Sequence, residues 1–227
     1  MQRVIAIDGP SGSGKSTCAR KLAKELGLLY IDTGAMYRAI GFWAQEKSIP
    51  FEEGELLNSF LKDIDLKYGQ SETNLIEIDG TNLTEKIREH EVSKLASIIS
   101  QVPSVRNFLV DFQRTLPSSN ICVMEGRDIG SVVFPHSFCK FFITTKTDLR
   151  ASRRLDELKA KGQVDLTLEQ IAHDIEERDK SDRNRSHSPL IQTEDAVLVE
   201  NGECLEKTMS TLKKKVLEKA QKNGIEI

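Results

Sequence analysis

The chain has 227 residues, of which 38% are hydrophobic and 30% are charged, and its formal net charge is −3. This length and composition indicate one globular domain with a hydrophobic core and room for an inserted or appended subdomain. The slightly acidic balance excludes the broad basic field that nucleic-acid-binding proteins use, so no nucleic-acid partner is expected. An anionic ligand would have to be held by a local cluster of arginines.

The sequence also shows no sign of export or of membrane insertion. The apolar stretch near the N-terminus is too short for a signal peptide, and no run approaches the ~18 apolar residues that a spanning helix needs. The four cysteines, Cys18, Cys122, Cys139 and Cys204, form no CxxC pair, which argues against a zinc or redox site. We therefore expect a cytoplasmic protein with no membrane partner, in which Cys122 and Cys139 are buried and reduced.

Short apolar runs alternate with helical patterns along most of the chain. The apolar runs that predict buried strands are 4–7, 28–31, 121–124, 138–144 and 196–199. The segments that predict helices are 15–26, 34–47, 104–116, 147–161, 167–184 and 204–222. Strands that alternate with helices predict an α/β fold with a parallel sheet covered on both faces.

One region departs from this alternation. Within residues 62–90, the segments IDLKY and NLIEI alternate apolar and polar residues and are separated by a polar, glycine-containing turn. The dipeptide at 79–80, Asp-Gly, offers a second tight turn. We therefore expect a small antiparallel β insertion at 62–90, followed by a helix at 91–101.

The strongest motif is GPSGSGKS at residues 9–16, which has the form GxxxxGK[ST] and lies between the first predicted strand and the first predicted helix. Its glycines allow a tight turn whose N–H groups point at phosphate oxygens, and the following helix adds its positive end. Lys15 is expected to reach the β- and γ-phosphates, Ser16 to offer its hydroxyl to Mg²⁺, and Thr17 to hold the α-phosphate. The residues expected to bind the nucleoside triphosphate are Gly9, Pro10, Ser11, Gly12, Ser13, Gly14, Lys15, Ser16 and Thr17. Mg²⁺, bound with the nucleotide, is the expected cofactor.

Three classes of protein share such a loop, and the rest of the sequence separates them. A GTPase switch needs a DxxG element, and no aspartate of this chain begins one. The segment TKTD imitates a guanine-reading motif, but its Asp148 fits better as the N-cap of the next helix. A motor ATPase needs a strand that ends in an acidic pair, whereas ICVMEGRD ends differently. A phosphotransferase to a small acceptor fits best.

Such an enzyme brings two phosphorylated anions together, so it needs arginines on several elements outside the loop. Arg38 follows the second predicted strand, and Arg106 lies early in a predicted helix. Arg127 follows a strand at the edge where open α/β sheets bind ligands. The segment LRASRR supplies three more, Arg150, Arg153 and Arg154.

The segment ERDKSDRNR at 177–185 is the most highly charged part of the chain. Taken alone, such a run is typical of a solvated helix face. Its spacing nevertheless places Arg178, Asp182 and Arg185 on one side of a helix, because they are related as i, i+4 and i+7. We expect that side to face the acceptor and the other side to face solvent.

Taken in order, the motifs GPSGSGKST, DTGAMYR, EGRDIGSVVFP and ERDKSDRNR resemble those of the bacterial cytidylate kinases, over about residues 3–200. The resemblance implies an adenylate-kinase-like P-loop fold: a five-stranded parallel sheet with helices on both faces, a monophosphate-binding insertion at 62–101, and a short lid at about 150–166. It also implies a single-domain, monomeric enzyme that transfers the γ-phosphoryl of ATP to CMP or dCMP. One departure is Glu125, where the family commonly has aspartate.

The resemblance further implies roles for individual residues. The arginines that would clamp the acceptor phosphate are Arg38, Arg127 and Arg185. The sugar would be held by Arg178 and Asp182, and Thr33 would lie near the acceptor. The residues that would read the cytosine edge are Ser97, Arg106 and Asp128. The catalytic set would be Lys15, Arg127, Arg185 and the lid residue Arg154.

The chemistry of cytosine agrees with this set of base readers. A carboxylate can accept from the exocyclic amine while an arginine and a hydroxyl donate to O2 and N3. Uracil has a carbonyl in place of the amine, so the same site would leave polar groups unpaired and reject it. Two alternatives stay open from the sequence: a kinase for another small acceptor, and a nucleotide-binding module that performs no catalysis.

Overall fold

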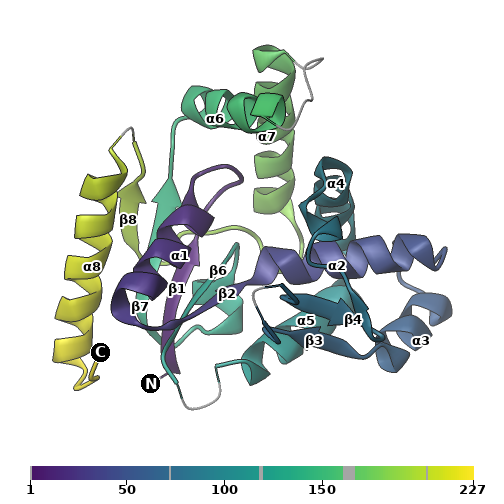
Figure 1. Cartoon of the computed structure of the whole chain (residues 1–227), viewed down its shortest axis with the longest axis horizontal. Coiled ribbons are helices and arrows are strands. Elements are labelled where there is room, and N and C mark those ends of the chain that lie inside the picture. Colours follow the sequence, from purple (N-terminus) through teal and green to yellow (C-terminus); the bar gives the residue numbers. More distant parts are fainter. Residues whose placement is uncertain (1, 72, 118–119, 161–166, 203) are drawn as a thin grey trace. The chain divides into compact units, whose positions relative to one another are not determined.

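A five-stranded sheet organises the first of two compact units in the computed structural model, which describes residues 2–71, 73–117, 120–160, 167–202 and 204–227. The strands lie in the order β2-β6-β1-β7-β8 (Figure 1). Their bounds are Gln2–Asp8 for β1, Leu29–Asp32 for β2, Cys122–Gly126 for β6, Ser137–Thr144 for β7 and Val197–Glu200 for β8. Central β1 pairs in parallel with both β6 and β7, which confirms the predicted parallel sheet.

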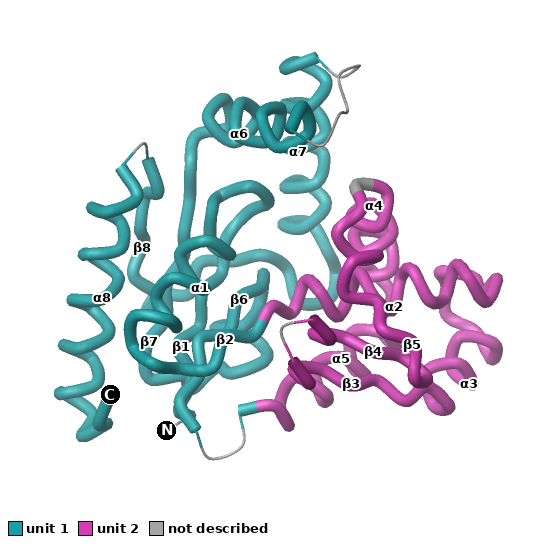
Figure 2. The backbone as a smooth tube through the Cα atoms, in the orientation of Figure 1, with its two compact units in different colours: residues 1–31, 117–227 teal, residues 32–116 magenta. Residues whose placement is uncertain are grey.

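Four long helices and one short one belong to the same unit, residues 1–31 and 117–227 (Figure 2). Their bounds are Lys15–Leu26 for α1, Ile129–Val133 for the π-helix η2, Thr147–Ala160 for α6, Leu168–Asn184 for α7 and Leu205–Lys222 for α8. Because α6 begins at Thr147, Asp148 lies in its first turn and is not the N-cap that the sequence predicted. The predicted lid at 150–166 is described only as far as Ala160, and 161–166 lie outside the described residues.

The second unit, residues 32–116, contains the region that departed from strand–helix alternation. Its three-stranded antiparallel sheet consists of β3 (Leu66–Tyr68), β4 (Ile76–Ile78) and β5 (Thr81–Asn82). Asp79 and Gly80 both have positive φ, 51° and 77°, as the predicted tight turn between β4 and β5 requires. The antiparallel insertion expected from the sequence is therefore confirmed as a sheet.

Helices make up the rest of this second unit. Their bounds are Thr33–Glu46 for α2, Glu55–Asp63 for α3, Lys86–Arg88 for the 3₁₀ helix η1, His90–Ile99 for α4 and Pro103–Thr115 for α5. The sequence analysis missed α3, although Leu57 and Leu61 lie four residues apart and are both buried. That spacing was the available signal, since it places both leucines on one helix face.

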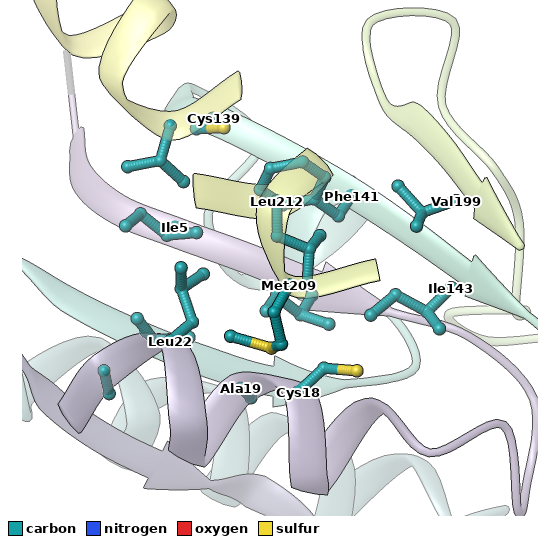
Figure 3. Packing of buried hydrophobic residues seen from close by; sticks show 14 of the residues in the cluster. Ile5, Cys18, Ala19, Leu22, Cys139, Phe141, Ile143, Val199, Met209 and Leu212 are labelled. Carbon is teal, nitrogen blue, oxygen red and sulfur yellow. The ribbon is translucent and has the colours of Figure 1, made fainter. Parts of the chain in front are cut away.

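The core of the first unit lies between the sheet and helices α1 and α8 (Figure 3). Ile5 and Phe141 project from β1 and β7, while Leu22 of α1 and Leu212 of α8 pack against them, each at most 1% exposed. The thiols Cys18, Cys122 and Cys139 are buried and free, as expected for the last two. None of the described helices combines the length and apolar character that a membrane span needs.

Leu212 provides a test of this packing. Replacing the fully buried Leu212 by alanine leaves a cavity between α8 and the sheet, so we expect the free energy of unfolding to fall by about 2–5 kcal/mol. The matched control is Leu217→Ala on the same helix, where the side chain is 44% exposed. A urea titration of both variants should show less than about 0.5 kcal/mol for the control. Equal losses would contradict the assignment of this core.

Candidate active site

The turn between β1 and α1 has a conformation that only glycine satisfies at two of its positions. Gly9 has φ 154°, and a Cβ there would collide with the carbonyl oxygen of Ile143 in β7. Gly14 has φ 80°, and a Cβ there would collide with Asn201. Because α1 begins at Lys15, its free backbone N–H groups and positive dipole end face this turn. The glycine-rich motif is thus built as a phosphate-binding loop.

Two polar side chains from other elements support the loop from behind. Asn201 donates from Nδ2 to the carbonyl oxygen of Ser13 at 2.9 Å. Thr145 donates from Oγ1 toward the same carbonyl at 3.0 Å and toward that of Asn201 at 2.9 Å. Both residues follow the ends of strands, β8 and β7, and the sequence analysis assigned neither of them a role. They keep the inner wall of the loop in place.

Lys15 is 6% exposed, and its ammonium donates to the carbonyl oxygen of Pro10 at 3.1 Å. Burial, together with the charges of Arg127 and Arg178, lowers its pKa from 10.5 to about 7, although the charges of Glu125 and Asp182 oppose the shift. A buried ammonium next to a guanidinium is poorly compensated. A bound phosphate would supply the missing negative charge, which suits Lys15 to the predicted role.

Ser16, in the first turn of α1, and Glu125, near the end of β6, bring a hydroxyl and a carboxylate together beside the loop. Ser16 donates from Oγ to Glu125 at 2.9 Å, and Tyr30 donates from its hydroxyl to the other carboxylate oxygen at 2.6 Å. The described residues contain no group of three or more His, Cys, Asp or Glu side chains placed to hold a metal ion. Mg²⁺ needs no such group, because it is held by one or two protein oxygens together with waters and nucleotide phosphates. Ser16 and Glu125 therefore fit the predicted Mg²⁺.

Asp8, the last residue of β1, connects the loop to the segment after β6. Its two carboxylate oxygens accept from the backbone N–H groups of Ile129 and Gly130 at 2.8 and 2.7 Å. These are the first residues of η2, and Asp128, a predicted base reader, immediately precedes them and is 4% exposed. Burial raises the pKa of Asp8 to about 7, against the effect of its two hydrogen bonds.

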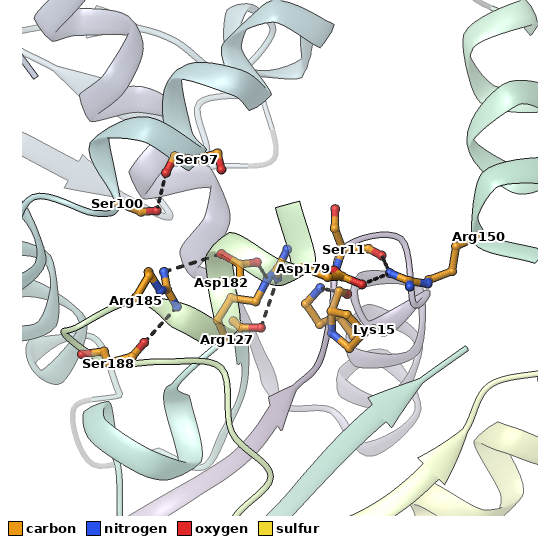
Figure 4. Close-up of polar contacts among 12 residues, drawn as sticks. Ser11, Lys15, Ser97, Ser100, Arg127, Arg150, Asp179, Asp182, Arg185 and Ser188 are labelled. Carbon is orange, nitrogen blue, oxygen red and sulfur yellow. Dashed lines mark hydrogen bonds and ion pairs between the residues drawn. The ribbon is translucent and has the colours of Figure 1, made fainter. Parts of the chain in front are cut away.

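Asp182 of α7 lies between two of the predicted phosphate-binding arginines (Figure 4). Arg127 donates from Nε to it at 2.8 Å, and a guanidinium nitrogen of Arg185 lies 3.7 Å away. Arg185 also donates to the carbonyl oxygen of Ser188 at 2.9 Å. Burial alone would raise the pKa of Asp182, but Arg127, Arg185 and Arg178 together lower it. The structure thus brings the predicted Arg127, Asp182 and Arg185 together, with Arg178 close enough to act on the same carboxylate.

Four other predicted acceptor residues belong to the second unit and are described within it. Thr33 is 3% exposed at the start of α2, and Arg38 pairs with Asp32 at 3.0 Å. Arg106 is 3% exposed, donates to the carbonyl oxygen of Ser100 at 3.1 Å, and lies 5.5 Å from the centre of the Tyr37 ring. Ser97 accepts through its carbonyl from the Ser100 hydroxyl at 3.0 Å.

The three arginines of LRASRR differ in their surroundings. Arg150 is 5% exposed and bound to Asp179 and to the carbonyl oxygen of Ser11. Arg153 donates to the carbonyl oxygen of Gly202. Arg154 pairs with Glu157 at 3.1 Å, and 30% of its side chain is exposed. Arg150 is therefore anchored within the fold, whereas Arg153 and Arg154 are both partly exposed.

With this geometry described, the chain can be compared with known proteins. The family model described as Cytidylate kinase matches residues 5–222. A cytidylate kinase from Pelotomaculum thermopropionicum is 43% identical and covers 86% of this chain and 87% of its own length. One from Desulforamulus reducens is 45% identical and covers 88% of this chain and 89% of its own length. An uncharacterized protein from Eubacterium ventriosum, solved by crystallography, aligns with a TM-score of 0.52 at 13% identity, over 94% of this chain and 97% of that one. At that identity, the last likeness concerns the fold alone.

The buried Asp8 generates a prediction about pH. Because its pKa rises from 3.8 to about 7 on folding, the unfolded chain releases this proton first, and the contribution of Asp8 to the free energy of unfolding declines as pH rises between those values. We expect the wild-type protein to lose more than about 1 kcal/mol relative to Asp8→Asn between about pH 4 and about pH 7. Denaturant titrations of both proteins at several pH values measure this. If the free energy of unfolding of the wild type minus that of Asp8→Asn stays constant or grows as pH rises, the raised pKa of Asp8 is wrong.

Proposed function

The chain belongs to the cytidylate kinase family, and from this premise we propose that it transfers the γ-phosphoryl group of ATP to CMP or dCMP, giving CDP or dCDP. The observation that carries the proposal is that the same compact unit holds a phosphate loop with a buried Lys15 and an arginine pair, Arg127 and Arg185, around Asp182. The phosphate loop with Lys15 suits a donor polyphosphate, and the arginine pair with Asp182 suits an acceptor phosphate and its sugar. As a kinase, the protein is a phosphotransferase.

On the donor side, the backbone of residues 9–17 surrounds the phosphates of ATP. Lys15 places its ammonium on the β- and γ-phosphates, where the added negative charge restores its ordinary pKa. Ser16 and Glu125 would hold Mg²⁺, which neutralises phosphate charge when bound with ATP. Thr17 holds the α-phosphate. These contacts orient the γ-phosphoryl group for in-line transfer.

On the acceptor side, arginine suits a phosphate because its planar fork can bond two oxygens. Arg127 and Arg185 bind the phosphate of CMP, and Arg178 and Asp182 hold the sugar hydroxyls. For Arg38 and Thr33 of the second unit, membership of the family implies roles toward the acceptor phosphate.

The base is read by a carboxylate, a guanidinium and a hydroxyl. Asp128 accepts from the exocyclic amine of cytosine, while Arg106 and Ser97 donate to its ring acceptors. Asp8 supports this reading indirectly, because it holds the two backbone N–H groups that follow Asp128.

Phosphoryl transfer then needs charge neutralisation and the exclusion of water more than covalent help. The acceptor is already an anionic phosphate, so no general base is required. Arg154, a partly exposed arginine of the predicted lid, closes over the transferring group and stabilises its developing charge. The lid that carries Arg154 also limits wasteful hydrolysis of ATP.

The monomeric state and the cytoplasmic location expected from the sequence remain predictions.

A panel of acceptors tests the proposal. With ATP and Mg²⁺, we expect CMP and dCMP to be phosphorylated far faster than UMP, AMP, GMP or sugar acceptors. Lys15→Ala should reduce kcat/KM by about a thousandfold or more, because it removes a charge that acts in the transition state. Lys21→Ala, an exposed lysine on the same helix, is the matched control. Turnover of another acceptor in preference to CMP would indicate a different kinase, and ATP binding without any turnover would indicate a regulatory module.

Asp128 provides a separate test of base selection. Asp128→Asn replaces an acceptor-only group by an amide that can also donate, so it can pair with the carbonyl of uracil. We expect the ratio of kcat/KM for CMP to that for UMP to fall by about tenfold or more, with the KM for ATP little changed. An unchanged ratio in a folded variant would show that Asp128 does not read the base.

A further inference from the structure

A buried ion pair that the proposed mechanism does not use links helices α6 and α7. Arg150 of α6 and Asp179 of α7 approach to 2.6 Å, and their side chains are only 5% and 7% exposed. Taking both charges out of water is costly, so such a pair is not by itself a sign of stability. Its further contacts indicate what it does.

Both partners of the pair also bind the phosphate loop at a single residue, Ser11 (Figure 4). The backbone N–H of Ser11 donates to Asp179 at 3.2 Å, and its carbonyl oxygen accepts from Arg150 at 2.8 Å. The stem of Arg150 lies against the next residue, since a Cβ at Gly12 would be 3.5 Å from the Cβ of Arg150. The pair therefore holds the loop at both backbone groups of Ser11: Asp179 binds the N–H group, and Arg150 binds the carbonyl oxygen.

Asp179 also lies one turn before Asp182 on the same helix, and the side chains of both are 7% exposed. Asp182 holds Arg127 and is near Arg185, the arginines assigned to the acceptor phosphate. Helix α7 thus carries two buried carboxylates one turn apart, of which one binds the donor loop and the other binds the acceptor arginines.

We infer that Asp179, held by Arg150, is a positioning residue for the donor phosphates. Its carboxylate accepts from the backbone N–H of Ser11 and so fixes this part of the phosphate loop, without touching the reacting atoms. This inference rests on the proposed function, because it concerns ATP bound at the same loop. It differs from a purely structural role, which would lower the amount of folded enzyme and leave both Michaelis constants unchanged.

The experiment compares full-length variants in steady-state kinetics. In Asp179→Ala, Ser11 loses its acceptor, and we expect the KM for ATP to rise by about tenfold while the KM for CMP changes less than about twofold. Asp179→Asn keeps an oxygen for the Ser11 N–H, so it should recover most of this loss. Asp174→Ala, an exposed aspartate on the same helix, is the matched control and should behave as the wild type.

Removing Asp179 alone leaves Arg150 as an unpaired buried charge, so the variant can lose stability for that reason. The double variant R150A/D179A removes both charges. In thermal unfolding, its melting temperature should be higher than that of D179A alone. Its KM for ATP should nevertheless stay raised, because Ser11 is still unsupported. D182A, in contrast, should raise the KM for CMP and leave that for ATP nearly unchanged.

Two results would overturn the inference. One is a folded D179A enzyme whose KM for ATP equals that of the wild type; the other is an equal rise in the KM for both substrates. If the wild-type protein phosphorylates neither CMP nor dCMP, the proposed function itself fails. In that case, calorimetry of ATP binding still tests the role of the contact between Asp179 and Ser11. If D179A binds ATP as tightly as the wild type does, the inference about Asp179 is wrong.

Discussion

The site is organised around two cationic side chains, the buried ammonium of Lys15 and the partly buried guanidinium of Arg127. Lys15 and Arg127 lie close enough that the charge of Arg127 lowers the pKa of Lys15. Glu125 and Asp182 offset this repulsion, but the ammonium still has a pKa near 7. Such a site favours an anion, and a bound polyphosphate would supply the negative charge that offsets this repulsion.

The parallel sheet explains why these groups meet. The phosphate loop follows β1, Glu125 lies near the end of β6 with Arg127 directly after it, and Thr145 follows β7. All of them therefore lie at the carboxyl edge of neighbouring strands. That edge is where open α/β sheets bind ligands. Helix α7 then adds its carboxylates from a distant part of the chain. The sheet brings the positive groups together, and α7 orients them.

Several features could be predicted because they depend on neighbours in the sequence. The loop at 9–16, the five strands and most helices follow from local patterns. The spacing of Asp182 and Arg185 predicted one helix face, but α7 ends at Asn184, so Arg185 approaches Asp182 from just beyond the helix end. Helix α3 carried the same kind of signal in Leu57 and Leu61 and was overlooked. The π-helix after Asp128 had no such signal, since its N-terminal N–H groups are satisfied by Asp8, more than a hundred residues away.

The sequence alone therefore predicted the chemistry: which residues are candidates for binding phosphate, which side of the helix at 167–184 carries them, and which family the chain resembles. Only the tertiary structure decided which charges are paired. Arg150 was one of three equivalent arginines in the sequence, yet folding buries it against Asp179, and Asp179 bonds with Ser11 across 168 positions of the chain. A charge pattern specifies what a side chain can bind, whereas its partner depends on which elements the hydrophobic core packs together.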